Sequence, residues 1–138
     1  KQSGLYGLSC GHSDMRDIIE NAAKGDENCA FAIDAFVYSL LKTIGSYVAV
    51  LGGVDALIFT AGIGENASLV REKLCARLAY LGIELDGEKN RARPAPAEIS
   101  APQSKVKVYV IPANEELMIA SETFALLDEL AETEPLAV

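Results

Sequence analysis

Two glycines follow an apolar stretch of strand length and form a candidate anion-binding turn. The stretch 56–59 (Ala-Leu-Ile-Phe) is continuously apolar, and Gly62 and Gly64 follow it closely. Glycine lets the backbone approach a ligand, and the first turn of a helix presents unpaired N–H groups. Asn66 is expected to cap the helix that comes next. A buried strand that runs into such a turn predicts a site for a phosphate or a nucleotide.

The same turn also matches the fingerprint of dinucleotide-binding enzymes. Residues 62–67 (Gly-Ile-Gly-Glu-Asn-Ala) fit G-x-G-x-x-[GA], and the acidic residues Glu84 and Asp86 lie about twenty positions further on. This pattern favours a nicotinamide or flavin enzyme, but glycines that merely allow a tight turn would explain it equally well. Because no G-K-[ST] follows the glycines, a P-loop is excluded.

An arginine lies among aspartates in the expected first turn of another helix. In the stretch 13–17 (Ser-Asp-Met-Arg-Asp), Arg16 places positive charge where the helix dipole disfavours it. One explanation is a surface salt bridge, which contributes little to stability. The other is a guanidinium that stabilises a phosphoryl group during its transfer. His12, the only histidine, has no evident partner and is expected to be structural or incidental.

A second stretch repeats the layout of strand, turn and helix start, and it carries two carboxylates. In 110–117 (Val-Ile-Pro-Ala-Asn-Glu-Glu-Leu), Asn114 is the expected helix cap and Glu115 and Glu116 follow it. Acidic residues in a first turn complement the helix dipole, which is a sufficient explanation. The alternative is that one carboxylate faces a cleft and holds Mg²⁺, usually through water, as an ATP site requires.

The composition is typical of one soluble domain. The chain has 138 residues, half of them hydrophobic, which is enough to bury a core. A net charge of −8 argues against nucleic acid or an anionic membrane as the main partner. The longest uncharged stretch, 43–54, is too short to span a bilayer. Three cysteines match no zinc spacing and are expected to be free thiols in a reducing cytoplasm: Cys10, Cys29 and Cys75.

Two helices are expected to precede the glycine turn. Residues 5–14 are expected to be a loop or the end of an upstream element, after which Ser13 or Asp14 caps a short helix that ends at Gly25. Asp26 then caps a long helix to about residue 51, whose apolar stripe indicates a core helix or a helix with one face on a partner subunit. The stripe consists of Ala30, Ile33, Val37, Leu40, Ile44, Tyr47 and Leu51.

Strands and helices are expected to alternate in the rest of the chain. A short strand at 83–85, a surface excursion at 86–104 and a strand at 105–111 follow a helix that stops at Gly82. That helix has its apolar stripe at Val70, Leu74, Leu78 and Leu81. The last helix is expected to bury Leu117, Ala120, Phe124, Leu127 and Ala131. This is an α/β pattern with too few strands to fill a sheet that is covered on both faces.

Three motifs in this order resemble the C-terminal part of the acetate kinase family, with which propionate kinases are closely related. The motifs are 13–17, 59–66 (Phe-Thr-Ala-Gly-Ile-Gly-Glu-Asn) and 111–117, and the resemblance covers nearly the whole chain. It implies an α/β fold: the C-terminal part of an actin/Hsp70/sugar-kinase-like (ribonuclease H-like) domain, with few strands flanked by helices. It also implies a homodimer joined through this domain, in the cytoplasm.

The resemblance implies a role for each matching residue. Arg16 would stabilise the transferring phosphoryl group, and Glu115, rather than Glu116, would help to bind Mg²⁺. The reaction would be ATP + acetate ⇌ ADP + acetyl phosphate by in-line transfer, with ATP and Mg²⁺ as cofactors and no protein nucleophile. The nucleotide would be bound by Asp14, Met15, Arg16, Gly62, Ile63, Gly64, Glu65 and Asn66.

The chain departs from the family pattern at two positions. Ala61 stands where the family usually has glycine, a change that is tolerated if φ is negative there. His12 stands where the family usually has serine, and the catalytic histidine of the family lies upstream. Residues 1–138 are therefore expected to be a single domain, the C-terminal nucleotide-binding portion of a larger kinase, inactive as an isolated chain. A dinucleotide-binding oxidoreductase domain and a non-catalytic dimerisation module are the alternatives.

Overall fold

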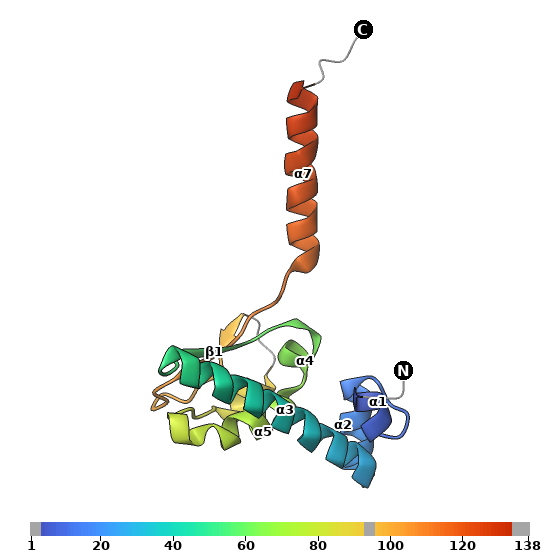
Figure 1. Cartoon of the computed structure of the whole chain (residues 1–138), viewed down its shortest axis with the longest axis vertical. Helices are drawn as coiled ribbons and strands as arrows, with labels where there is room; N and C mark the ends of the chain where they lie inside the picture. Colours follow the sequence, from blue (N-terminus) through green and yellow to red (C-terminus); the bar gives the residue numbers. More distant parts are fainter. Residues whose placement is uncertain (1–3, 93–95, 134–138) are drawn as a thin grey trace.

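The chain folds as a small sheet with helices packed on it and a last helix that extends away from the body (Figure 1). The structure is a computed structural model that describes residues 4–92 and 96–133. In chain order the elements are α1 (Gly4–Leu8), α2 (Met15–Ala23), α3 (Glu27–Leu51), β1 (Ala56–Phe59), α4 (Ala61–Asn66), α5 (Ser68–Arg77), the 3₁₀ helix η1 (Ala79–Leu81), α6 (Gly87–Arg91), β2 (Ala97–Glu98), β3 (Lys107–Val110) and α7 (Glu115–Thr133).

The sheet has three strands in the order β1-β3-β2. β1 and β3 run parallel, with Phe59 opposite Val110, so both strands end at the same edge of the sheet. β2 pairs antiparallel with β3. The expected strands at 56–59 and 105–111 are thus confirmed, whereas the expected strand at 83–85 is reduced to one bridge between Leu85 and Ser100. The α/β class that the sequence predicts is confirmed.

Aspartate caps fix the start of α2 and α3, as predicted. The Asp14 side chain accepts a hydrogen bond from Arg16 N and starts α2. The Asp26 side chain accepts from Asn28 N and Cys29 N and starts α3. At the other end, Gly52 adopts φ 74°, the left-handed conformation that ends helices. Upstream of these caps, the short helix α1 occupies part of the segment that was expected to be a loop or the end of an upstream element.

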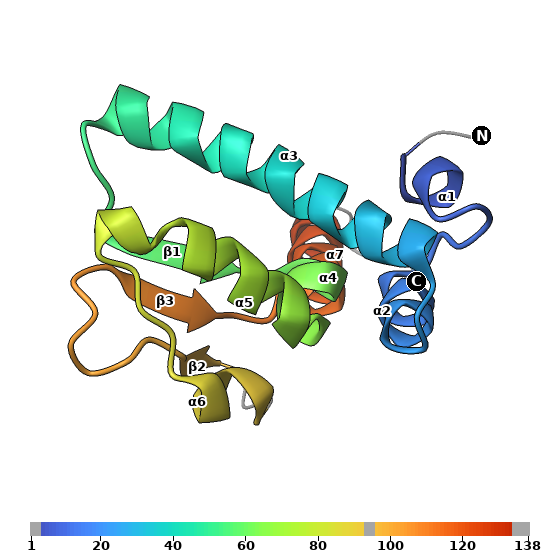
Figure 2. The same ribbon diagram turned by 90° about the horizontal axis from the view of Figure 1, so that it is seen from below.

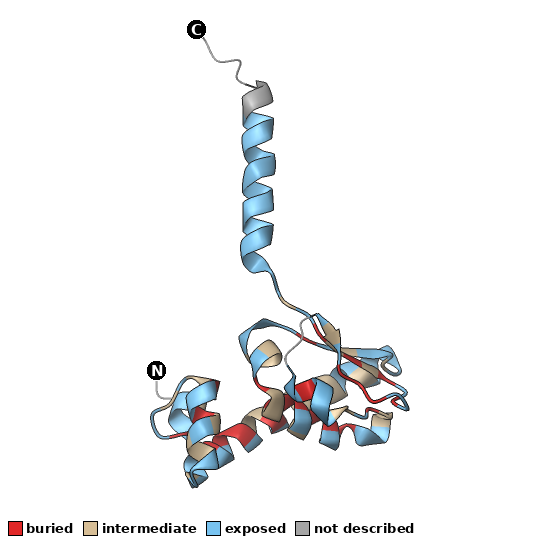
Figure 3. Cartoon of the chain, turned by 180° about the vertical axis from the view of Figure 1, so that it is seen from behind, coloured by how far each residue is buried: buried red, intermediate tan, exposed pale blue. Residues whose placement is uncertain are grey.

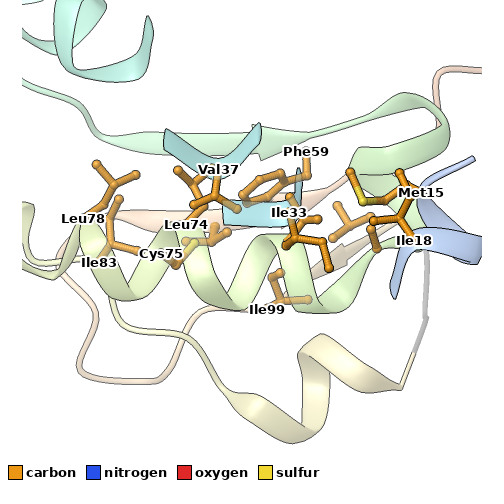
Figure 4. Packing of buried hydrophobic residues seen from close by; sticks show 14 of the residues in the cluster. Met15, Ile18, Ile33, Val37, Phe59, Leu74, Cys75, Leu78, Ile83 and Ile99 are labelled. Atoms are coloured by element: carbon orange, nitrogen blue, oxygen red, sulfur yellow. The ribbon is translucent and has the colours of Figure 1, made fainter. Parts of the chain in front are cut away.

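The core lies between α3, α5 and the sheet (Figure 2, Figure 4). The stripe predicted for the helix before Gly82 is confirmed at Val70, Leu74 and Leu78, which are buried. Its last member, Leu81, lies in η1 after the end of α5 and is half-buried against the core. The stripe of α3 is right only in its first part: Ile33 and Val37 are buried and Leu40 and Ile44 pack against the core, but Ala30, Tyr47 and Leu51 are exposed. The C-terminal end of α3 stands away from β1, which leaves the end of the stripe uncovered (Figure 2).

The segment 86–104 is more deeply packed than its composition predicts. It was expected to be a surface excursion, yet it contains α6 and β2 and buries Asn90, Ile99, Ser100 and Ser104. The Ser104 hydroxyl donates to Val106 O at 2.6 Å, which keeps a buried polar group paired. Pairing of β2 with β3 brings the segment onto the sheet, a long-range contact that local composition does not encode.

α7 has no buried face within the described residues (Figure 3). Leu117, Phe124 and Leu127 are 65%, 70% and 55% exposed, and Ala120 is exposed too. The prediction that this stripe is buried is wrong, because segment 111–114 carries the helix axis away from the body (Figure 1). The side chain of Ala131 lies outside the described residues.

By length and composition, α3 is the one helix in the described parts of the chain that could cross a membrane. Its apolar window carries at most two charged residues and is 22% buried, whereas the sequence prediction considered only the uncharged run 43–54. Core helices of soluble proteins meet the same criterion. α3 contributes Cys29, Ala32, Ile33 and Val37 to the core.

Candidate functional site

The two glycines lie inside a short helix of their own, where the sequence predicted a turn. Thr60 precedes α4 in extended conformation, and Gly62 and Gly64 occupy the body of this six-residue helix. Asn66 is its last residue, and its side-chain amide donates to Gly62 O at 2.9 Å. The prediction that Asn66 caps the next helix is therefore wrong, because α5 begins after Ala67, which makes no side-chain cap.

At Gly64, Gly62 and Ala61, the space available for a Cβ and the backbone conformation place different demands on the residue type. A Cβ on Gly64 would lie 3.3 Å from the Phe59 carbonyl carbon, so glycine allows α4 to pack on the end of β1. A Cβ on Gly62 would meet open space. Ala61 has φ 58°, so the condition of a negative φ fails and the residue holds a left-handed conformation that costs about 1–2 kcal/mol.

A first pocket of about 500 Å³ joins the two strand-to-helix turns. Since β1 and β3 are parallel neighbours, the turns at their carboxyl ends lie side by side. Ala113 N donates to the Glu65 carboxylate at 3.1 Å and ties the turns together. Asn114 has φ 49°, a left-handed residue before α7. The lining residues are Ala61, Gly62, Glu65, Pro112, Ala113, Asn114, Glu115, Glu116 and Leu117.

A second pocket of about 440 Å³ joins α4 to the start of α2. Gly62 lines this pocket and the first one, so the three sequence motifs surround a continuous region of surface. Met15 also lines it, but its side chain is only 4% exposed and packs in the core (Figure 4). The lining residues are Ser13, Asp14, Met15, Arg16, Ile19, Gly62, Ile63, Asn66 and Ala67.

Arg16 forms a forked ion pair with the residue that caps its own helix. Its Nε lies 3.0 Å and its Nη2 2.6 Å from different carboxylate oxygens of Asp14. These hydrogen bonds lower the pKa of Asp14 to about 2, and the carboxylate raises the pKa of Arg16. The arginine side chain is 81% exposed, so the pair adds little stability but holds a guanidinium at the rim of the second pocket.

The first pocket has an excess of carboxylates. Glu65, Glu115 and Glu116 line it. The described residues contain no group of three or more His, Cys, Asp or Glu side chains that could hold a metal by themselves. Mg²⁺ is usually held by one or two carboxylates together with substrate phosphates and water, so Glu115 with a bound phosphate fits this ion.

Sequence reasoning missed a buried arginine directly behind α4. Arg71 is 2% exposed and donates to backbone carbonyls of Gly64 and Glu65. Its spacing was a usable signal, because positions 71, 74, 75 and 78 fall on one face of a helix and all of them are buried. A charged residue on an apolar face indicates a paired buried charge.

The remaining candidates lie outside both pockets. His12 N donates to Ser9 Oγ at 3.0 Å, a local turn contact. All three cysteines are free, as predicted: Cys10 is exposed and Cys29 and Cys75 are buried. Burial raises the pKa of Cys75 to about 12, so this thiol stays protonated and unreactive.

Comparison with known proteins gives consistent matches. The model of the Acetokinase family matches residues 1–121. The chain is 52% identical to the acetate kinase of Heliobacterium modesticaldum and 53% identical to that of Carboxydothermus hydrogenoformans, over 127 residues each. Both alignments cover 92% of this chain and 32% of the relative. The chain therefore spans about a third of the length of these relatives.

Solved structures match over a similar share. The Porphyromonas gingivalis acetate kinase aligns with a TM-score of 0.82 and 42% identity over 92% of this chain and 32% of that one. A propionate kinase from Francisella tularensis aligns with a TM-score of 0.79 and 44% identity over 88% and 31%. The Entamoeba histolytica acetate kinase aligns with a TM-score of 0.84 and 38% identity over 89% and 33%.

Proposed function

The chain belongs to the acetokinase family, and on this premise we propose that it supplies the nucleotide and Mg²⁺ side of a kinase active site. Its fold is the corresponding part of the actin/Hsp70/sugar-kinase-like fold of its structural relatives, as predicted. The reaction we propose is ATP + acetate ⇌ ADP + acetyl phosphate. Propionate is the alternative acyl acceptor, because a propionate kinase is among the structural matches.

The observation that supports this proposal best is the position of Gly62. It lines the pocket formed with residues 13–16 and the pocket formed with residues 112–117. One extended ligand could therefore contact all three motifs. We propose that the nucleotide does so through the residues at 14–16 and 62–66, with its phosphates near the N-terminal end of α4, where N–H groups are unpaired.

The charges around these pockets are consistent with a metal-dependent phosphate site. Arg16 is the one cationic side chain that lines either pocket within the described residues, against the carboxylates of Asp14, Glu65, Glu115 and Glu116. A polyphosphate would be repelled by this set unless a cation accompanied it. We propose that Glu115 holds Mg²⁺, which neutralises phosphate charge when it is bound.

Arg16 is the residue that we propose acts in the transfer itself. The acetate oxygen forms a bond to the γ-phosphorus while the bond from this phosphorus to the ADP oxygen breaks, so no protein nucleophile is needed. A planar guanidinium can donate two hydrogen bonds to phosphoryl oxygens at once. Asp14 holds that group in one orientation, which reduces the entropy lost when it meets the phosphoryl group.

Family membership counts against the two alternative functions. The oxidoreductase hypothesis explained the glycines but not the stretches at 13–17 and 111–117, and none of the relatives described above is an oxidoreductase. A non-catalytic dimerisation module would not explain why residues from all three motifs line two adjoining pockets. We keep dimerisation as a second property of the chain, because the end of the α3 stripe leaves Tyr47 and Leu51 63% and 73% exposed.

Ligand titration tests the proposal directly. We expect calorimetry on the 138-residue chain to show binding of MgATP and MgADP and no comparable binding of NADH. Strong preference for NADH would contradict the proposal. We expect Gly62→Ala to keep its fold, because its Cβ meets open space, yet to weaken MgATP binding by filling the nucleotide surface. If this variant bound MgATP with unchanged affinity, the proposal that the nucleotide contacts α4 would be contradicted.

The isolated chain is expected to bind without turning over. An assay for acetyl phosphate should give no product with the 138 residues alone, because we place the remaining substrate contacts in the two-thirds of the relatives that this chain does not span. Normal rates from the chain alone would contradict that division of the active site.

A further inference from the structure

Arg71, which the proposed chemistry leaves without a role, is fully enclosed behind the glycine turn. A guanidinium buried to 2% exposure requires its N–H groups to be paired, or its burial is very costly. Arg71 Nε donates to Asn90 Oδ1 and Nη2 donates to Asn90 O, each at 2.7 Å. Nη1 donates to Gly64 O at 2.8 Å and to Glu65 O at 2.9 Å.

Asn90 completes the arrangement from the other side. It belongs to α6 and is 1% exposed. While its side-chain and backbone oxygens accept from Arg71, its amide Nδ2 donates to Ser68 O, the first residue of α5, at 3.0 Å. The side-chain amide of Asn90 thus has both its donor and its acceptor paired, and it fixes the guanidinium plane relative to α5.

These contacts act on α4 at its C-terminal end. A helix of six residues is marginal by itself, and its last carbonyls have no partners within the helix. Arg71 pairs two of them and places positive charge at the negative end of the helix dipole. The opposite end of α4 carries Ala61 and Gly62, which line the pockets.

We propose that Arg71, oriented by Asn90, is a positioning residue for the nucleotide. It touches no ligand; it holds α4 so that Gly62 keeps its place in the lining of both pockets. This inference rests on the proposed nucleotide function of the turn. The four buried hydrogen bonds of the Arg71 guanidinium, rather than its charge alone, hold α4 in place. They engage two adjacent carbonyls of α4 and both oxygens of Asn90 at the same time.

The test compares variants of this pair with a conservative variant of a core residue. Arg71→Lys keeps the positive charge but cannot make all four hydrogen bonds of the guanidinium. Asn90→Ala removes the side chain that orients Arg71, whereas Asn90→Asp retains an acceptor for Arg71 Nε. Ile83→Val serves as the control, because Ile83 is a 2% exposed core residue outside both pockets. Each variant is titrated with MgATP at a temperature where thermal scans show it fully folded.

We expect Arg71→Lys and Asn90→Ala to weaken MgATP binding about tenfold, the scale typical of outer-shell partners. Asn90→Asp should recover part of the affinity lost in Asn90→Ala, because it keeps the acceptor for Nε but loses the Nδ2 donor to Ser68 O. Ile83→Val should leave the affinity unchanged. Equal affinity in Arg71→Lys and the parent, or a loss that Ile83→Val reproduces, would overturn the inference. If Arg71→Lys does not fold, Asn90→Ala decides the question by the same comparison.

A measurement on the free chain separates this inference from the proposed function. Hydrogen exchange of the amides at 65–67 should accelerate in Arg71→Lys and Asn90→Ala but not in Ile83→Val, since these amides report the order of α4. Unchanged exchange would overturn the positioning role whatever the nucleotide does. Absence of MgATP binding to the parent chain would instead overturn the nucleotide function, with the exchange result still deciding whether Arg71 anchors α4.

Discussion

At the scale of single residues, the pair formed by Asp14 and Arg16 combines a structural and a chemical task. The same carboxylate caps α2 through Arg16 N and holds the guanidinium through Nε and Nη2. A residue placed among aspartates against the helix dipole was a usable signal in the sequence. The geometry of the fork was not predictable, because it depends on the rotamer that the cap imposes.

Arg16 can be tested in a chimera, in which this chain replaces the matching third of the acetate kinase of Heliobacterium modesticaldum. We expect Arg16→Ala to lower kcat by about 10³-fold or more, the scale seen when a cation that stabilises a transferring phosphoryl group is lost. Arg77→Ala, an exposed arginine that stacks on Tyr38, is the control. A chimera with unchanged kcat would favour a non-catalytic role for Arg16.

The capping carboxylate makes a pH-dependent contribution to stability. The pKa of Asp14 falls from 3.8 to about 2 in the folded chain, because Arg16 donates to it. A lowered pKa stabilises the folded state above the unfolded pKa, and this contribution is lost as the pH falls from about 4 to about 2. Other carboxylates, such as Asp26, also have lowered pKa values, so the parent alone does not isolate Asp14.

Asp14→Asn isolates this contribution, since asparagine still caps a helix but cannot form the ion pair. We expect the difference in urea midpoint between parent and variant to be largest above pH 4 and to shrink as the pH approaches 2. A difference that stays constant from pH 6 to pH 2 would contradict the assigned origin of the pKa shift.

At the scale of elements, the strained start of α4 predicts a stabilising substitution. Ala61 has φ 58°, which costs about 1–2 kcal/mol for a residue with a Cβ, against about 0.5–1 kcal/mol of extra backbone entropy for glycine. We expect Ala61→Gly to raise the free energy of unfolding by about 0.5–1 kcal/mol in urea denaturation. Ala49→Gly, at an exposed position inside α3, should lower it by about 1 kcal/mol. Losses of equal size in both variants would show that Ala61 is unstrained.

The elements divide by the range of the interactions that form them. Asp14, Asp26 and Gly52 act on their own helix ends, so the sequence predicts α2 and α3 closely. Contacts between distant segments were missed: β2 pairs with a strand about ten residues away, and Arg71 bonds Asn90 across 19 positions. Periodicity predicted the apolar stripe of α7, but the expectation that another part of the chain covers this stripe was wrong.

The candidate site shows the same division. The residue types at 13–17, 62–66 and 111–117 were readable from the sequence, and parallel pairing of β1 with β3 explains why two of these stretches adjoin. The break between α4 and α5 was not readable, because Ala67 makes no side-chain cap that a local pattern would reveal. The prediction that Asn66 caps the next helix was wrong for that reason.

At the scale of the whole molecule, the main feature is the exposed apolar surface at the C-terminal end of α3. Tyr47 and Leu51 extend the core stripe of α3 beyond the body. If this surface joins two copies, Tyr47→Glu should shift sedimentation from dimer towards monomer, while Ala49→Glu should not. The control adds the same charge to an exposed position about 200° away around the helix. A parent chain that is monomeric at all concentrations, or a shift shared by both variants, would contradict the dimer proposal.

Gly62 lines both pockets, and this shared residue has a thermodynamic consequence. If a group that binds in one pocket shifts α4, it also changes the free energy of binding in the other pocket. Linkage then requires reciprocity: the factor by which occupancy of one side alters affinity on the other is the same in both directions. The two sides of the site would titrate as one coupled equilibrium rather than as two separate affinities.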